Sequence, residues 1–98
     1  MSKRKVFVID NDFTIKWEKL NEQLFVHIEI VRMDTSVFSR IKAAWTAFMA
    51  QAYFEGYEDI YTYTQDPRIV KMVGGAVELQ NDKLKATPDW RMFKWELK

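Results

Sequence analysis

The chain has 98 residues, no cysteine and a formal net charge of +1. This length predicts one domain, residues 1–98, with a core large enough to fold alone. The near-neutral charge gives no general electrostatic reason to bind nucleic acid, and the lack of cysteine excludes disulfides and thiolate chemistry. Because the apolar runs are too short to span a membrane, we expect a soluble protein.

Three strands are predicted before the first helix. Lys5–Ile9 is rich in β-branched residues, and apolar residues alternate with polar ones from Phe13 to Trp17. A turn over Lys19–Gln23 is expected to lead into the third strand, Leu24–Val31. The short connections predict an antiparallel meander. One face of the third strand carries Val26, Ile28 and Ile30, and the other carries Phe25, His27, Glu29 and Val31.

A long helix is predicted from Ser36 to Gly56. Thr35 or Ser36 is expected to cap its start, and Gly56 is expected just past its end. Its apolar residues recur at spacings of three and four, which is typical of a helix with one buried face. We therefore expect the sheet to pack against this helix. The stripe consists of Ile41, Trp45, Phe48 and Ala52, widened by Phe38 and Met49.

The second half of the chain predicts a strand, a short helix and two more strands. The helix is expected to start at Asp66-Pro67, with Pro67 in its first turn, and to stop at Gly74-Gly75. A right-handed crossover is expected to make the strands before and after it parallel, and the last two strands are expected to pair antiparallel. The predicted strands are Ile60–Thr64, Ala76–Gln80 and Trp90–Leu97, with a loop at Asn81–Pro88.

Together these elements predict an α+β fold in the order β-β-β-α-β-α-β-β. The sheet is expected to be mixed but mainly antiparallel, with about six strands and with one long and one short helix packed on it.

This order resembles the core of the GNAT family of N-acetyltransferases without its first helices. The stretch DPRIVKMVGGAVELQ looks like the family's short helix leading to the penultimate strand, and WRMFKWEL looks like its last strand. The second half is also similar to GNAT-like internal virion proteins of short-tailed bacteriophages. The resemblance covers roughly Leu24–Leu97. It implies a minimal GNAT-like core and a phage-encoded protein that is located in the host cytoplasm or in the virion.

The features that bind acetyl-CoA in that family are missing here. Active members carry [Gln/Arg]-x-x-Gly-x-[Gly/Ala] before the long helix, where glycines let backbone N–H groups approach the pyrophosphate. The corresponding stretch contains no glycine, and the position of the family's general-acid tyrosine falls near Lys71. The resemblance therefore implies a degenerate member without catalysis or cofactor. The alternative is an active acetyl-CoA-dependent N-acyltransferase with an altered phosphate loop. The degenerate loop contains Arg32, Asp34, Thr35 and Ser36.

His27 and Glu29 are the candidates for chemistry, because they share one face of the third strand. They could activate an amine as a base. A polar pair that is bonded to a Lys or Tyr of a neighbouring strand is the favoured interpretation. With one histidine and no cysteine, no metal site is expected.

Aromatic residues are the candidates for binding a protein partner, because Tyr and Trp are enriched at interface hot spots. A structural role is favoured for each of them taken singly. The expected role is that of a virion component or of an inhibitor that docks onto a host protein, so the expected partner is a host or virion protein. An open sheet edge also favours a homodimer. Nucleic-acid binding through Ser2–Lys5 is the least favoured function, and no membrane binding is expected. The aromatic candidates are Trp17, Tyr53, Tyr57, Tyr61, Tyr63 and Trp90.

Overall fold

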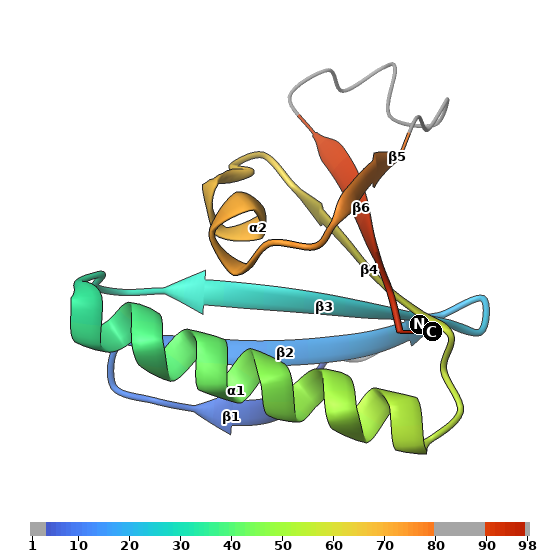
Figure 1. Ribbon diagram of the computed structural model, residues 1–98, viewed down its shortest axis with the longest axis horizontal. Coiled ribbons are helices and arrows are strands. Elements are labelled where there is room, and N and C mark those ends of the chain that lie inside the picture. The colour runs from blue at the N-terminus through green and yellow to red at the C-terminus, as the bar shows by residue number, and fades with distance from the viewer. Residues whose placement is uncertain (1–3, 80–89, 98) are drawn as a thin grey trace.

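The computed structural model describes residues 4–79 and 90–97, which form one six-stranded sheet and two helices (Figure 1). The strand order is β1-β2-β3-β4-β6-β5. The predicted α+β class and the order of elements are confirmed. The elements are β1 (Lys5–Ile9), β2 (Phe13–Leu20), β3 (Gln23–Ile30), α1 (Thr35–Phe54), β4 (Asp59–Thr64), α2 (Arg68–Val73), β5 (Val77–Leu79) and β6 (Arg91–Glu96).

The hairpin between β2 and β3 is tighter than predicted. Only Asn21 and Glu22 lie in its turn, with φ of 51° and 66°, so the predicted turn over Lys19–Gln23 is wrong. Two consecutive residues with positive φ make the turn that best matches the twist of paired strands. The strands therefore pair up to Leu20 and Gln23, which sets the register of the meander.

The helix α1 begins one residue earlier than predicted because Asp34 caps it. The carboxylate of Asp34 accepts a hydrogen bond of 2.9 Å from the N–H of Val37. The prediction that Thr35 or Ser36 is the cap is wrong, since both lie in the first turn. At the other end Gly56 has φ of 94°, so the predicted glycine past the helix is confirmed.

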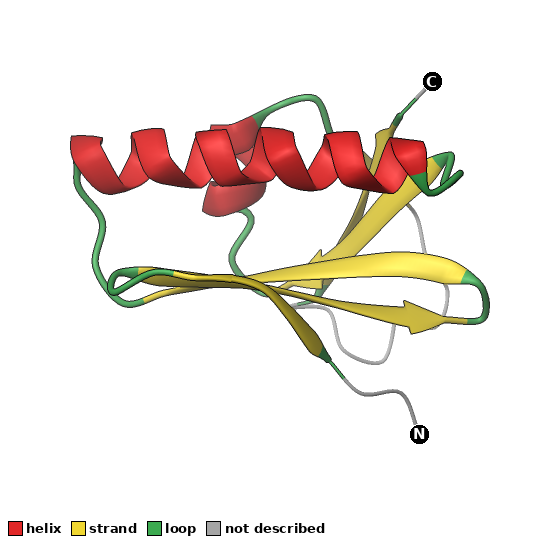
Figure 2. Cartoon of the chain, turned by 90° about the horizontal axis from the view of Figure 1, so that it is seen from below, coloured by secondary structure: helices red, strands yellow, loops and turns green. Residues whose placement is uncertain are grey.

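Both helices lie on the same side of the sheet, and the core lies between them and the strands (Figure 2). The indole of Trp45 lies 4.6 Å from that of Trp95 between ring centroids, which ties α1 to β6. The predicted buried face of the helix is confirmed. Its buried residues are Val37, Ile41, Trp45, Phe48 and Ala52. The strands contribute Phe13, Ile15, Leu24, Val26, Ile60, Phe93 and Trp95.

The parallel neighbours in the sheet are β3 and β4, which are joined through α1. The predicted parallel relation between β4 and β5 holds only for their direction, since β6 lies between them and pairs antiparallel with both. The β3–β4 ladder has two residue pairs, Leu24 with Ile60 and Phe25 with Tyr61. Beyond these pairs the two strands diverge, and α2 lies beside the gap (Figure 1).

The remaining boundaries differ by small shifts. Pro67 lies just before α2 instead of in its first turn, and Asp66 accepts a hydrogen bond of 3.1 Å from the N–H of Arg68. The edge strand β1 contains a register shift between Val6 and Val8, a device that discourages edge-to-edge pairing. The predicted loop Asn81–Pro88 lies outside the described residues.

Candidate functional site

The face of the sheet opposite the helices carries a buried pair of ionisable side chains, Glu18 from β2 and His27 from β3. His27 Nε2 lies 3.0 Å from Glu18 Oε1, and their exposed fractions are 9% and 6%. Burial lowers the pKa of His27, although the hydrogen bond to Glu18 opposes this shift. His27 is therefore neutral at pH 7, and in the tautomer with the proton on Nε2 it donates to Glu18 Oε1.

Glu29, the predicted companion of His27, is bonded elsewhere. Its carboxylate lies 2.9 Å from the ammonium of Lys16 on β2, and this bond lowers the pKa of Glu29. Glu29 is exposed, so it lacks the burial that sets His27 apart. The structure thus pairs His27 with Glu18 and pairs Glu29 with a lysine of the neighbouring strand.

Four aromatic rings lie beside the His27–Glu18 pair on the same face. Tyr63 lies 5.1 Å from the ring of His27, and its hydroxyl donates a long hydrogen bond of 3.4 Å to Glu18 Oε1. Phe25 lies 5.5 Å from Tyr61 and 5.8 Å from Tyr63, and Tyr63 lies 5.6 Å from Trp90. Phe25, Tyr61, Tyr63 and Trp90 are called the aromatic face below.

The other aromatic candidates lie elsewhere. Trp17 pairs with Val26 and packs against the core under α1, so it does not lie with Tyr61 and Tyr63. Strand residues alternate between faces, and Trp17 falls on the helix side. Tyr57 also packs against the core, whereas Tyr53 is 54% exposed on α1 beside Phe54.

The start of α1 is held to the β1–β2 turn by a network of ion pairs. Arg40 bonds to Asp10 and lies 2.8 Å from Asp12, and Arg32 bridges Asp12 at 3.1 Å and Asp34 at 2.6 Å. Hydrogen bonds from the arginines lower the pKa of Asp10 and Asp12, and the bond from the N–H of Val37 lowers that of Asp34. Three carboxylates against two guanidinium groups leave a net charge of −1.

These residues do not fit a diphosphate. The N–H of Val37 is taken by the carboxylate of Asp34, and the N–H of Phe38 by the carbonyl oxygen of Asp34 at 2.9 Å. Val37 is fully buried, so its side chain fills the core beneath the helix start. The Asp34 carboxylate, whose side chain is 42% exposed, would repel an anion that approaches the degenerate loop.

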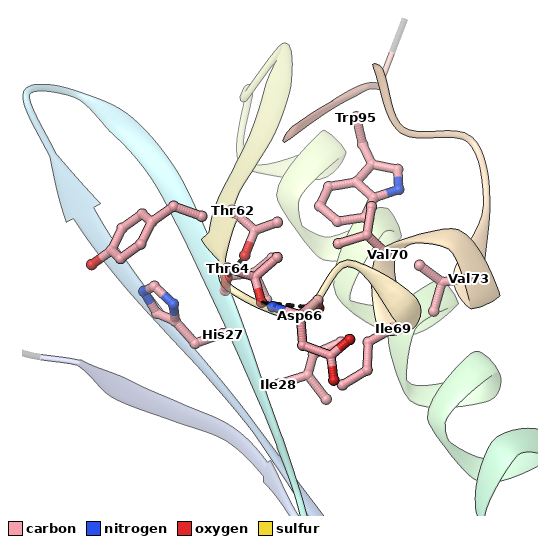
Figure 3. Close-up of a pocket in the computed structure, with 11 residues that line it drawn as sticks. His27, Ile28, Thr62, Thr64, Asp66, Ile69, Val70, Val73 and Trp95 are labelled. Atoms are coloured by element: carbon pink, nitrogen blue, oxygen red, sulfur yellow. Dashed lines mark hydrogen bonds between the residues drawn. The ribbon is translucent and has the colours of Figure 1, made fainter. Parts of the chain in front are cut away.

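Two adjoining cavities lie in the gap between β3 and β4. The smaller, about 70 Å³, runs between the strands and has His27, Thr62, Val70 and Trp95 in its wall (Figure 3). The larger, about 470 Å³, continues between β3 and α2. Asp66 and Ile69 line both cavities, so the two cavities adjoin, and together they are treated below as one hollow. The larger cavity is also lined by Ile30, Met33, Arg68 and Met72.

Glu18 and Phe25 were missed as candidates. Both fall on the aromatic face because the two-residue turn places Glu18 directly opposite Phe25 and one step diagonal to His27. The predicted five-residue turn does not fix the register of β2 against β3. Recognising the two-residue turn at Asn21 and Glu22 would have placed Glu18 near His27, whereas no sequence motif marks Glu18.

Comparison of the chain with protein-family models, curated proteins and solved structures finds no match. Within residues 4–79 and 90–97, neither helix has the combination of length and hydrophobicity needed to cross a membrane. In the same residues no group of three or more His, Asp or Glu side chains is placed to hold a metal ion.

Proposed function

We propose that this protein is a non-catalytic binding domain with a GNAT-like core that docks onto another protein through its aromatic face. The observation that carries the proposal is the cluster of four aromatic rings in mutual contact on the side of the sheet that neither helix covers. Phe25 itself is buried, so the contact area comes from the half-buried Tyr61, Tyr63 and Trp90. Rings held by one another lose little conformational freedom on binding.

A protein suits this surface better than a small molecule does. The rings lie along two neighbouring strands and just before the start of β6, so they are spread over the sheet. Charges of both signs border the cluster, with Lys16 paired to Glu29 and Lys94 near Glu96. Aromatic centres with a mixed polar rim are typical of protein interfaces.

The helix start supports the non-catalytic part of the proposal. Asp34 occupies the N–H groups that a pyrophosphate would need, and both nearby arginines are already paired with carboxylates. The GNAT-like core itself is supported by the order of elements and by the long helix between β3 and β4. A phage origin and a role as virion component or host inhibitor stay predictions from the sequence.

The second candidate function is an acetyl-CoA-dependent N-acyltransferase. One observation favours it: His27, which is hydrogen-bonded to Glu18, lines the cavity between the strands, where a neutral imidazole could accept a proton from an amine. We rank it below the binding function because the residues at the start of α1 do not fit the diphosphate of the cofactor.

The test compares capture of partners by the full chain and by two tyrosine variants. Tyr61→Ala truncates the aromatic face, and Tyr53→Ala truncates an exposed tyrosine on α1 as the matched control. A captured protein is then purified and titrated against all three chains. We expect Tyr61→Ala to weaken binding at least tenfold, the loss of a hot-spot residue, and Tyr53→Ala to bind like the parent. Equal binding by the two variants would overturn the proposal.

A further inference from the structure

Within residues 4–79 and 90–97, the edge of β3 that faces β4 is paired with no strand beyond Phe25. The N–H of Val31 donates to Asp12 O at 2.8 Å, so backbone groups of odd-numbered residues point to the β2 side. The carbonyl oxygen of Val26 instead accepts from Thr62 Oγ1 at 2.7 Å, so even-numbered residues point to β4. Since the β3–β4 ladder ends at Phe25, the backbone groups of Ile28 and Ile30 point into the gap.

The hollow beside this edge is mostly apolar. Ile30 is the last residue of β3, Met33 lies three residues beyond it, and Ile69 and Met72 come from α2. At the rim Asp66 and Arg68 are 2.6 Å apart and neutralise each other. A molecule bound in the hollow would therefore contact the backbone N–H and C=O groups of Ile28 and Ile30 on one side and apolar side chains on the other. We call this hollow the β3–α2 groove.

We propose that the β3–α2 groove binds an extended peptide segment, which adds as a strand to Ile28 and Ile30. The inference rests on the proposed function, since it assigns how part of the protein partner is held. Backbone N–H and C=O groups at a strand edge are matched by those of another extended chain. Alternate side chains of the segment enter the apolar hollow, while the others point toward the aromatic face.

A single segment fits better than a second copy of this domain. The groove is walled by β3 on one side and by β4 and α2 on the other, so a folded edge strand would bring its own neighbours into collision (Figure 1). From Ile28 to Ile30 the strand rises about 7 Å, so the central two or three residues of an extended segment can pair with this edge. The paired rim charges favour a segment with little net charge.

The test uses a displayed library of random octapeptides as the probe. Selection is carried out on the full chain, with a Met72→Asp variant as the counter-selection because it puts a charge into the groove. Enriched peptides are synthesised and titrated against Ile30→Ala and Ile30→Pro. Both substitutions remove the same side chain, but only proline removes the N–H that points into the groove. Both variants are first shown by circular dichroism to be folded.

We expect an enriched peptide to bind the Ile30→Ala chain within about threefold of the parent and the Ile30→Pro chain at least tenfold more weakly. We also expect hydrogen exchange of the Ile28 and Ile30 amides to slow at least tenfold in the complex. Equal binding by the two variants, unchanged exchange, or no enrichment over the Met72→Asp chain would each overturn the inference. Displacement of the peptide by acetyl-CoA would also overturn it.

The two proposals fail separately. If a purified partner is lost on Tyr61→Ala but binds Ile30→Pro and Ile30→Ala equally, the docking function stands and the strand addition is wrong. If the partner binds Tyr61→Ala and Tyr53→Ala equally, the docking function itself is wrong.

Discussion

His27 Nε2 lies 3.0 Å from Glu18 Oε1, with both side chains buried on a sheet face that no described helix covers. Their burial comes from the aromatic rings around them, especially Tyr63, which contacts both. A polar pair sealed by aromatic side chains holds those rings in fixed positions, because a shift of either ring would expose or unpair a buried group.

Removing one member of this pair should cost more than removing both. We expect Glu18→Leu to lower the free energy of unfolding by about 1–3 kcal/mol, because His27 is left buried without its partner. The double variant Glu18→Leu, His27→Leu should recover part of that loss. Urea unfolding of the four chains measures the coupling, and strictly additive losses would contradict the pairing.

Acid should weaken the fold in two steps, of which His27 causes the first. Its pKa is lowered on folding, so as the pH falls below the unfolded value of 6.5 the unfolded chain binds the proton first. This contribution is full above pH 6.5 and declines below it. Glu18, Glu29, Lys16 and Arg4 are the charged groups facing His27. Melting temperatures of the parent and of His27→Gln between pH 8 and pH 5 should diverge, and parallel curves would refute the assignment.

The second acid step belongs to the carboxylates at the start of α1. The pKa values of Asp10, Asp12 and Asp34 are lowered on folding, so their stabilisation is present above the ordinary value of 3.8 and is lost as the pH falls through the folded values. We expect 1 M salt to reduce this step by screening the exposed ion pairs. Melting curves at pH 5 and pH 3 with and without salt measure it.

The cap of α1 gives a matched pair of substitutions. Asp34→Ala removes the acceptor for the N–H of Val37 and one partner of Arg32, so it should lower the melting temperature by a few degrees. Ser36→Ala changes an exposed residue within the first turn and should have little effect. If Ser36→Ala lowered the melting temperature more than Asp34→Ala, Ser36 and not Asp34 would be the cap.

Truncation of Trp45 should be among the most damaging single changes. Its indole is 3% exposed, stacks on Phe48 and lies tilted against Trp95, so Trp45→Ala leaves a cavity between α1 and β6. We expect a loss of about 3–5 kcal/mol. Tyr53→Ala on the exposed side of the same helix should stay within about 0.5 kcal/mol. Urea denaturation compares the two, and a Trp45→Ala chain that unfolds like the parent would show that the helix is packed differently.

Acetyl-CoA separates the two candidate functions. Because Asp34 occupies the helix start, we expect no change in melting temperature at millimolar cofactor. A ligand present at 100 times its Kd stabilises the native state by about 2.7 kcal/mol, which would be plainly visible. A rise in melting temperature with acetyl-CoA that disappears in Thr62→Trp, which fills the cavity between β3 and β4, would favour the acyltransferase. It would count against the docking function.

Local chemistry in the sequence was enough to place most elements. The three-four spacing from Ile41 to Ala52 predicted the buried side of α1, and alternation in β3 predicted which residues share a face. Both patterns depend on the fixed geometry of a single helix or strand, so no neighbour is needed to read them.

Contacts between elements were harder to predict. The register of β2 on β3 depends on a turn of two residues, and without it neither the Glu18–His27 pair nor the position of Trp17 could be derived. The cap at Asp34 was also not predicted. Asp, Ser and Thr are all good capping residues, and only the backbone conformation of Asp34 shows which of them caps the helix.

The sequence by itself determined the α+β class, the order of the eight elements and the core face of the long helix, because these follow from local periodicity and turn chemistry. The tertiary structure alone decided that β6 lies between β4 and β5, that β3 and β4 diverge after two residue pairs, and that His27 meets Glu18. These relations join residues far apart in the chain, and strand register and packing select them.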